Sequence, residues 1–154
     1  MNEFTQKKLG EVIAFSRIGC ELVDRSGEAF TEALQERGTN FVSDLKNLEQ
    51  SVMTYATDVT HAKAEKTTEK LRTMMEQYVG DEWDNPVEIL EWLSFFTGSA
   101  SAHWALVVGA AEGANNEDLM NTAEKGGEVY HDYLHDVIEA LYKIGLAQDD
   151  EVDE

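Results

Sequence analysis

The fold is decided by residues 85–118, which read NPVEILEWLSFFTGSASAHWALVVGAAEGANNED. Asn85 followed by Pro86, the only proline of the chain, is typical of a helix start, with asparagine as N-cap and proline at the first helical position. The Gly-Ala-Asn-Asn segment at 113–116 is typical of a helix end. The sequence therefore predicts one helix over residues 87–112.

The remaining segments show no strand alternation and are predicted to be helical as well. Gly-Thr-Asn at 38–40 predicts another break between helices. These breaks predict four helices, over residues 3–37, 41–79, 87–112 and 117–147. Short connections between long helices favour antiparallel neighbours. The predicted fold is all-α: an antiparallel up-down-up-down four-helix bundle that forms one domain over residues 1–147.

The helix predicted over residues 41–79 changes phase along its length. Its apolar positions follow one face as far as Val59 and a different face from Ala64 onward. This shift predicts a bend, or a different neighbour for the second half.

The chain of 154 residues is strongly acidic, with 12 Lys and Arg against 31 Asp and Glu and a formal net charge of −19. Its length suits one domain. The acidic excess argues against direct binding to a nucleic-acid backbone. It favours either adaptation to a saline habitat or an acidic surface that meets a basic protein partner.

The chain carries one cysteine, which cannot form an intrachain disulfide. We expect Cys20 to be a buried structural thiol rather than a nucleophile. A cytoplasmic location is expected, since nothing in the cysteine usage or in the polar first residues points to export. The acidic run QDDEVDE at 148–154 is predicted to be a disordered tail.

Residues 92–111 carry no formal charge unless His103 is protonated. The segment has the length of a membrane span, but it contains several Ser, Thr and Gly residues and lacks flanking Lys or Arg. We therefore expect a buried helix of a soluble protein. Because an outer helix of a bundle normally keeps one polar face, this helix predicts a second packing surface. The simplest form is a two-fold dimer through residues 87–112, and the alternative is a cover formed by loops or tails of the same chain.

The stretch Glu128-Val129-Tyr130-His131 places a carboxylate and an imidazole one turn apart on one helix face. His135 extends the same stripe by another turn. Mixed carboxylate and imidazole ligands suit a divalent metal ion. The pattern predicts Glu128, His131 and His135 as ligands of iron, manganese or zinc.

Residues 103–141 resemble the third-to-fourth helix region of rubrerythrin and ferritin-like proteins. In that family an apolar helix, a short turn rich in Asn and Asp, and an amphipathic helix carrying Glu-x-x-His follow one another. The family binds two iron ions and acts in iron oxidation, iron storage or peroxide removal. The resemblance implies these ligands: Glu128 with His131, Asp58 with His61, and the single carboxylates Glu21 and Glu91.

Two other arrangements of the histidines stay open. His61, His131 and His135 resemble the three-histidine site of the DinB-like bundles. His103 falls about level with His61 along the predicted bundle, which would allow a shared site. As a buried side chain, His103 would instead be hydrogen-bonded within the core, with Ser99 as an expected partner.

Two classes of function follow. The first is a metal-binding ferritin-like bundle that uses Glu128 and His131, with His61, His103 or His135 as further ligands. The second is a non-catalytic acidic helical protein that acts by oligomerisation or by partner binding, as a scaffold, a surface coat or a nucleic-acid mimic. The orientation of the stripe on the helix predicted over 117–147 separates the two classes, because a bundle metal site needs its ligands to point inward.

Overall fold

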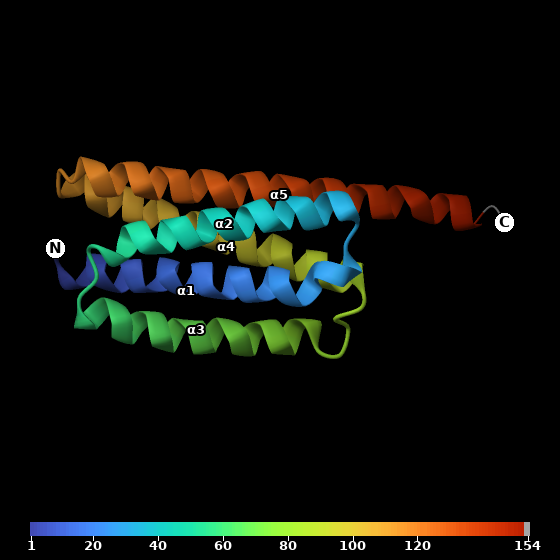
Figure 1. Cartoon of the computed structure of the whole chain (residues 1–154), viewed down its shortest axis with the longest axis horizontal. Helices are drawn as coiled ribbons and strands as arrows, with labels where there is room; N and C mark the ends of the chain where they lie inside the picture. The colour runs from blue at the N-terminus through green and yellow to red at the C-terminus, as the bar shows by residue number, and fades with distance from the viewer. Residues whose placement is uncertain (153–154) are drawn as a thin grey trace.

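The computed structural model describes the backbone of residues 1–152 and the side chains of residues 1–148. This part of the chain forms five α-helices and one short 3-10 helix, with no strand. The elements are α1 (Glu3–Ser26), η1 (Gly27–Ala29), α2 (Glu32–Met53), α3 (Asp58–Val79), α4 (Pro86–Gly113) and α5 (Glu117–Val152) (Figure 1). The all-α prediction is confirmed. The prediction of four helices is wrong: two of the predicted helices are each divided, and the pieces on either side of the predicted break at 38–40 form one helix, which gives five.

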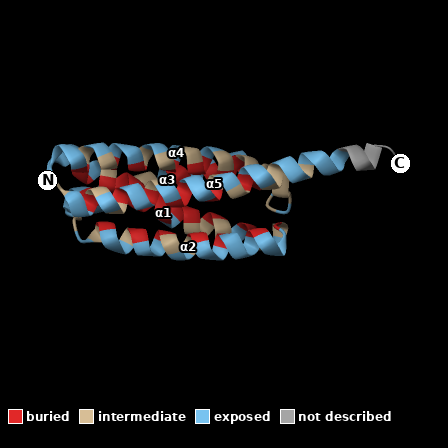
Figure 2. Ribbon diagram, turned by 90° about the horizontal axis from the view of Figure 1, so that it is seen from above, coloured by how far each residue is buried: buried red, intermediate tan, exposed pale blue. Residues whose placement is uncertain are grey.

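Each helix runs antiparallel to the one before it, and together they form an elongated bundle (Figure 1). Helix α1 lies at the centre and packs against α2, α3 and α4, whereas α5 packs along α4 and α2. Every residue from 9 to 16 of α1 is buried. Buried residues face the interior of the bundle in Figure 2, in which α5 extends past the other helices.

The chain turns between α1 and α2, within the segment that was predicted to be one helix over residues 3–37. The Ser26 hydroxyl donates to the Leu22 carbonyl at 2.7 Å near the end of α1. Thr31 is the N-cap of α2, and its hydroxyl accepts a hydrogen bond of 3.3 Å from the Leu34 backbone N–H. A threonine in this role satisfies one of the free N–H groups of the first turn. The prediction of one continuous helix is therefore wrong.

The break predicted at residues 38–40 is also wrong, because Gly38 is buried inside α2. A Cβ atom at this position would lie 2.9 Å from Cγ1 of Val23 on α1 and 3.5 Å from the Tyr133 hydroxyl on α5. Such a Cβ atom would force Val23 to move. Gly38 therefore allows close packing of α2 on its neighbours instead of ending a helix.

The helix predicted over residues 41–79 is divided at the turn between α2 and α3. Thr57 and Thr60 form a reciprocal capping box at the start of α3, in which the Thr57 N–H donates to the Thr60 hydroxyl at 3.0 Å. The Gln6 side chain of α1 accepts from both threonine hydroxyls and donates to the Tyr55 carbonyl at 3.1 Å. The phase change in the sequence thus marks a separate helix that packs on α1.

Both predicted ends of the apolar helix are confirmed. The Asn85 side chain accepts a hydrogen bond of 3.1 Å from the Val87 N–H, and Pro86 occupies the first turn of α4. After α4, Asn115 takes a positive φ of 55°. The Asn116 side chain accepts a hydrogen bond of 3.1 Å from the Leu119 N–H at the start of α5.

Helix α5 continues through Val152. The side chains from residue 149 onward and the backbone of residues 153–154 lie outside the described part of the chain. The backbone of the predicted acidic tail, residues 148–154, is thus described as helical through Val152, but nearly all of its side chains lie outside the described part of the chain, so its predicted disorder stays a prediction.

Candidate interaction surface

The predicted metal ligands of α5 lie on the outside of the bundle. Glu128, His131 and His135 are all exposed, so the stripe that they form does not point inward. Over the described residues, no three His, Cys, Asp or Glu side chains gather closely enough to hold a metal ion. The metal hypothesis therefore has no preformed site in this part of the chain and stays a prediction.

The other two histidines lie on different helices. His61 is exposed in the first turns of α3, which packs on α1 and α4 rather than along α5. It is therefore not brought together with His131 and His135. His103 of α4 is half-buried and turned toward α1, where its ring lies 4.8 Å from the Phe15 ring.

The remaining carboxylates implied by the ferritin-like resemblance have other surroundings. Glu21 forms a two-point ion pair with the Arg72 guanidinium, with N···O distances of 3.0 and 3.1 Å. Asp58 is exposed in the first turn of α3. Glu91 is half-buried and accepts a hydrogen bond of 3.5 Å from the Tyr78 hydroxyl. The structure brings none of the three to the stripe on α5.

Cys20 is half-buried on α1, and its thiol donates to the Val42 carbonyl with an S···O distance of 3.9 Å. Burial raises the pKa of the Cys20 thiol above its ordinary value. Because the thiolate is the nucleophilic form of cysteine, this environment favours the structural role that the sequence predicts.

His103 belongs to a polar cluster around Glu11 that sequence reasoning missed. Glu11 is buried on α1, and its carboxylate lies 3.1 Å from Lys8 Nζ and 3.8 Å from Lys63 Nζ of α3. His103 Nε2 lies 3.4 Å from the same carboxylate, and His103 Nδ1 lies 2.8 Å from the expected partner Ser99, at its carbonyl oxygen. The cluster joins three helices. Its only signal in the sequence is the single charge within the apolar run LGEVIAF at 9–15.

Among the described helices, none covers one side of α4. The exposed side chains of this outer face are Phe95, Ser99, Ala102, Ala105, Leu106 and Gly109. Phe95 is 62% exposed and Leu106 is 45% exposed. No Asp, Glu, Lys or Arg occurs over residues 92–111. The bundle therefore covers only one side of the helix that was predicted to need two packing surfaces.

Side chains of neighbouring helices extend the outer face of α4 at both ends. Near the start of α4, the Tyr78 ring of α3 meets Phe95 edge-on, with ring centroids 5.6 Å apart. Near the end of α4, Phe4 of α1 is 53% exposed. The exposed apolar surface thus spans three helices.

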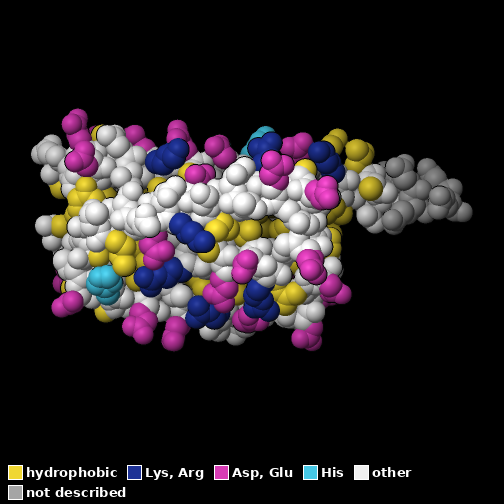
Figure 3. All heavy atoms as spheres, viewed as in Figure 1, with side chains coloured by type: hydrophobic (Ala, Val, Ile, Leu, Met, Phe, Trp, Pro, Cys, Tyr) yellow, Lys and Arg dark blue, Asp and Glu magenta, His cyan; other side chains and the backbone are white. Residues whose placement is uncertain are grey.

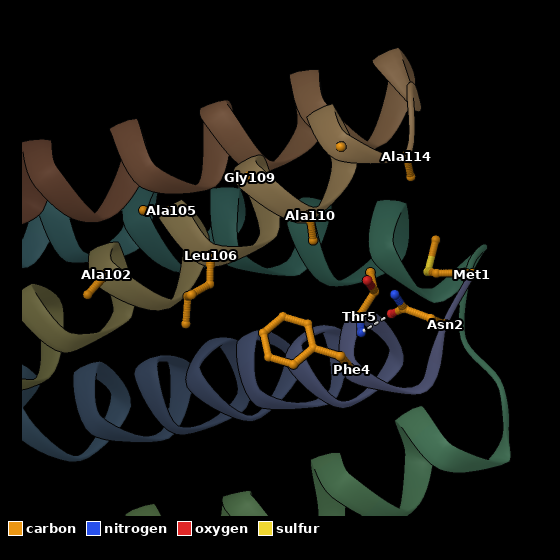
Figure 4. A pocket seen from close by; sticks show the side chains of 11 residues that line it. Met1, Asn2, Phe4, Thr5, Ala102, Ala105, Leu106, Gly109, Ala110 and Ala114 are labelled. Atoms are coloured by element: carbon orange, nitrogen blue, oxygen red, sulfur yellow. Dashed lines mark hydrogen bonds between the residues drawn. The ribbon is translucent and has the colours of Figure 1, made fainter.

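A groove lies between the start of α1 and the second half of α4 (Figure 4). It has a volume of about 840 Å³. Phe4 and Leu106 project into this region from the two helices, while Ala102, Ala105 and Gly109 line it with little side-chain bulk (Figure 4). The lining is mainly apolar, so the groove suits an apolar side chain from another molecule.

The side of the bundle formed by α1, α2 and α3 has a different character. Figure 3 shows acidic and basic side chains interspersed over it, with small apolar areas between them. Ion pairs occur on this side, including Arg17 with Glu49 at 2.8 Å and the pair of Arg72 with Glu21. The apolar surface of α4 is thus distinct from this mixed, charged side.

Comparison of the chain with protein families, with curated proteins and with solved structures found no match. The resemblance to rubrerythrin and ferritin-like proteins therefore stays a prediction. Among the described helices, none is both long enough and apolar enough to cross a membrane.

Proposed function

We propose that this chain is a non-catalytic helical protein that acts by binding another protein through the outer face of α4. The observation that carries the proposal is the exposure of Phe95 and Leu106 on a helix with no formal charge over residues 92–111. Single exposed apolar residues are normal on protein surfaces. A continuous apolar surface that is surrounded by charge marks an interaction site.

Physical chemistry supports a helical or similarly flat partner. Full burial of a Leu or Phe side chain stabilises an association by about 1.5–3 kcal/mol. The small residues Ala102, Ala105 and Gly109 between these anchors allow another backbone to approach closely. The large side chains Phe95 and Leu106 therefore provide binding free energy, and the small residues between them allow close packing of the partner.

The net charge of −19 supports selective association. Acidic proteins, a second copy of this chain included, and nucleic acids are repelled at long range, so a partner must bring enough apolar surface to α4 to offset the repulsion. The outer face of α4 carries no acidic group over residues 92–111, so a basic partner would bind elsewhere on the acidic surface. Such a partner stays a separate prediction.

Metal binding is the second candidate function. Glu128, His131 and His135 do not point inward as a bundle site requires, but their one-turn spacing on the outer side of α5 leaves all three open to an ion from solvent. Such a site would lie on the surface, unlike the buried sites of ferritin-like bundles. The geometry supports partner binding better, because the outer face of α4 needs no rearrangement in order to act.

Photo-crosslinking in cells tests the proposed function. Benzoylphenylalanine is introduced at Ala105 on the outer face of α4, and at the exposed Gln50 on α2 as the control. We expect discrete protein adducts from position 105 and none of the same mass from position 50. Absence of adducts at position 105, or identical adducts at both positions, would overturn the proposal.

A further inference from the structure

We infer that the protein bound at the outer face of α4 is a second copy of this chain, docked antiparallel about a two-fold axis at Ala102. The inference rests on the proposed function and adds the identity of the partner and its register. It follows from the pattern of large and small side chains, from the groove, and from the distribution of charge along α4.

The outer face of α4 is complementary to itself. In a two-fold interface the same patch lies on both sides. Ala102 of one copy lies on the axis, opposite Ala102 of the other copy. A residue seven positions before Ala102 in one copy is then level with the residue seven positions after Ala102 in the other copy. Phe95 is then level with Gly109, and Leu106 is level with Gly98. Each large side chain meets a glycine.

The spacing of this face suits a pair of helices. Phe95, Ser99, Ala102, Leu106, Gly109 and Gly113 alternate steps of four and three residues. An average repeat of 3.5 residues keeps a seam facing a partner helix. By contrast, the large apolar side chains that α5 exposes up to residue 148 are Ile138, Tyr142 and Leu146, at steps of four. A constant step of four turns progressively around a helix, so α5 offers no equivalent straight seam.

The register also fills the groove. Phe95 and Tyr78 form an exposed aromatic pair at the start of the outer face. Gly109, the residue level with Phe95, lines the groove between α1 and α4. Antiparallel docking therefore inserts the aromatic pair of each copy into the groove of the other, beside Phe4 and Leu106. The two-fold axis therefore creates two equivalent contacts, each between the aromatic pair of one copy and the groove of the other.

The charges favour the antiparallel direction. Glu88 and Glu91 lie just before the uncharged segment of α4, and both are half-buried. A parallel pair would set these carboxylates against their own copies, which costs free energy. The antiparallel register instead places Glu91 level with Gly113 and Glu88 level with Asn116. The exposed Glu112 is placed level with the buried Trp92, so no acidic residue of α4 is level with another one.

The size of the surface predicts a moderate affinity. The seam from Phe95 to Gly113 is about 27 Å long at about 1.5 Å per residue. With Phe4 and Tyr78 at its ends, this seam of one helix's width is expected to bury less than the standard specific interface of about 800 Å² per partner and to fall among the weaker ones. We therefore expect a reversible dimer with a dissociation constant in the micromolar range.

Cysteine crosslinking tests the partner and the register together. Ala102→Cys is made in a Cys20→Ser background and treated with a short bis-maleimide reagent. Only a residue on the two-fold axis meets its own copy, so we expect this variant to form covalent dimers at least tenfold faster than Ala62→Cys, an exposed control on α3. A mixture of Phe95→Cys and Gly109→Cys should likewise crosslink faster than either variant alone.

Equal rates at positions 102 and 62 would overturn the inference, and so would faster self-crosslinking of Gly109→Cys than of Ala102→Cys. These results leave the proposed function standing if position 105 still forms adducts with a different protein. Absence of any adduct at position 105 removes the proposed function as well. The two failures are therefore distinguishable.

Discussion

Trp104 of α4 lies directly against Gly126 of α5. A Cβ atom at residue 126 would stand 2.8 Å from Cε3 of the indole ring and closer still to two other ring carbons. Trp104 is fully buried at this contact. Because Gly126 carries no side chain, α4 and α5 approach each other closely at this contact, where Trp104 is turned toward α5.

Gly126→Ala is expected to destabilise the protein by about 2 kcal/mol, since overpacking a close contact costs about 1–3 kcal/mol. Gly127→Ala is the matched control, because a Cβ atom there meets nothing within 4 Å. Alanine in an open helix position stabilises by about 0.5–1 kcal/mol. Urea unfolding measures both free energies. Equal effects of the two substitutions would contradict the close contact.

Glu11→Gln is expected to lower the free energy of unfolding by about 1–3 kcal/mol, because it leaves Lys8, Lys63 and His103 around a neutral group. Glu65→Gln, an exposed site on α3, serves as the control and should change stability by less than about 0.5 kcal/mol. Thermal unfolding at neutral pH compares the two variants. A Glu11 variant as stable as the control would show that the cluster does not join the helices.

Burial raises the pKa of Tyr130 above its ordinary value, and among the described residues its hydroxyl makes no hydrogen bond of standard geometry. Ser16 lies beside it but donates its own hydroxyl hydrogen to the Val12 carbonyl at 3.1 Å. Because the pKa in the folded state exceeds that of the unfolded chain, the contribution to stability is present below about pH 10 and is lost as the pH rises.

Tyr130→Phe should therefore be at least as stable as the original protein at pH 7 and should lose less stability between about pH 10 and 11.5. Tyr142→Phe is the matched control, because Tyr142 lies exposed on the same helix. Urea midpoints across this pH range measure the difference. Parallel pH curves for the original protein and the Tyr130 variant would contradict the burial of the hydroxyl.

Elemental analysis separates the two candidate functions. Protein without an affinity tag, purified without chelator, should contain less than about 0.1 metal ion per chain, since a stable site needs three or more well-placed ligands. His131→Ala should not change this value. Stoichiometric iron, manganese or zinc that the substitution removes would instead favour a site at Glu128, His131 and His135.

The sequence predicts helix ends well where the signal is local. Asn85 and Asn116 cap helices through bonds to residues two or three positions away, so their roles are visible in the sequence. Gly38 gave the wrong prediction of a helix break because its role is in tertiary packing, where it leaves space for the Val23 side chain. The helix boundaries at Ser26 and Thr57 were not predicted because Ser and Thr also occur inside helices. At Thr57 the local capping box with Thr60 is joined by contacts with Gln6, which is distant in sequence.

The candidate surface could be predicted in part. The uncharged helix indicates that a second packing surface is needed, but not which side of α4 stays open. That side depends on α1, which takes the centre of the bundle and carries Glu11 inside it. The contributions of Phe4 and Tyr78 come from helices distant in sequence, so no local pattern reveals them. The inward or outward direction of His131 likewise depends on the register between α5 and its neighbours.

Sedimentation equilibrium of the original chain and of Leu106→Glu, at low and high salt, is the most direct test that α4 joins two copies. We predict a mass approaching 34.6 kDa, twice the 17.3 kDa of one chain, at high micromolar concentration. The dimer should strengthen with salt, because screening weakens the repulsion between two copies of charge −19. Leu106→Glu should remain at 17.3 kDa. A mass of 17.3 kDa for the original chain at every concentration and salt level, or an equally stable dimer of the variant, would contradict the account.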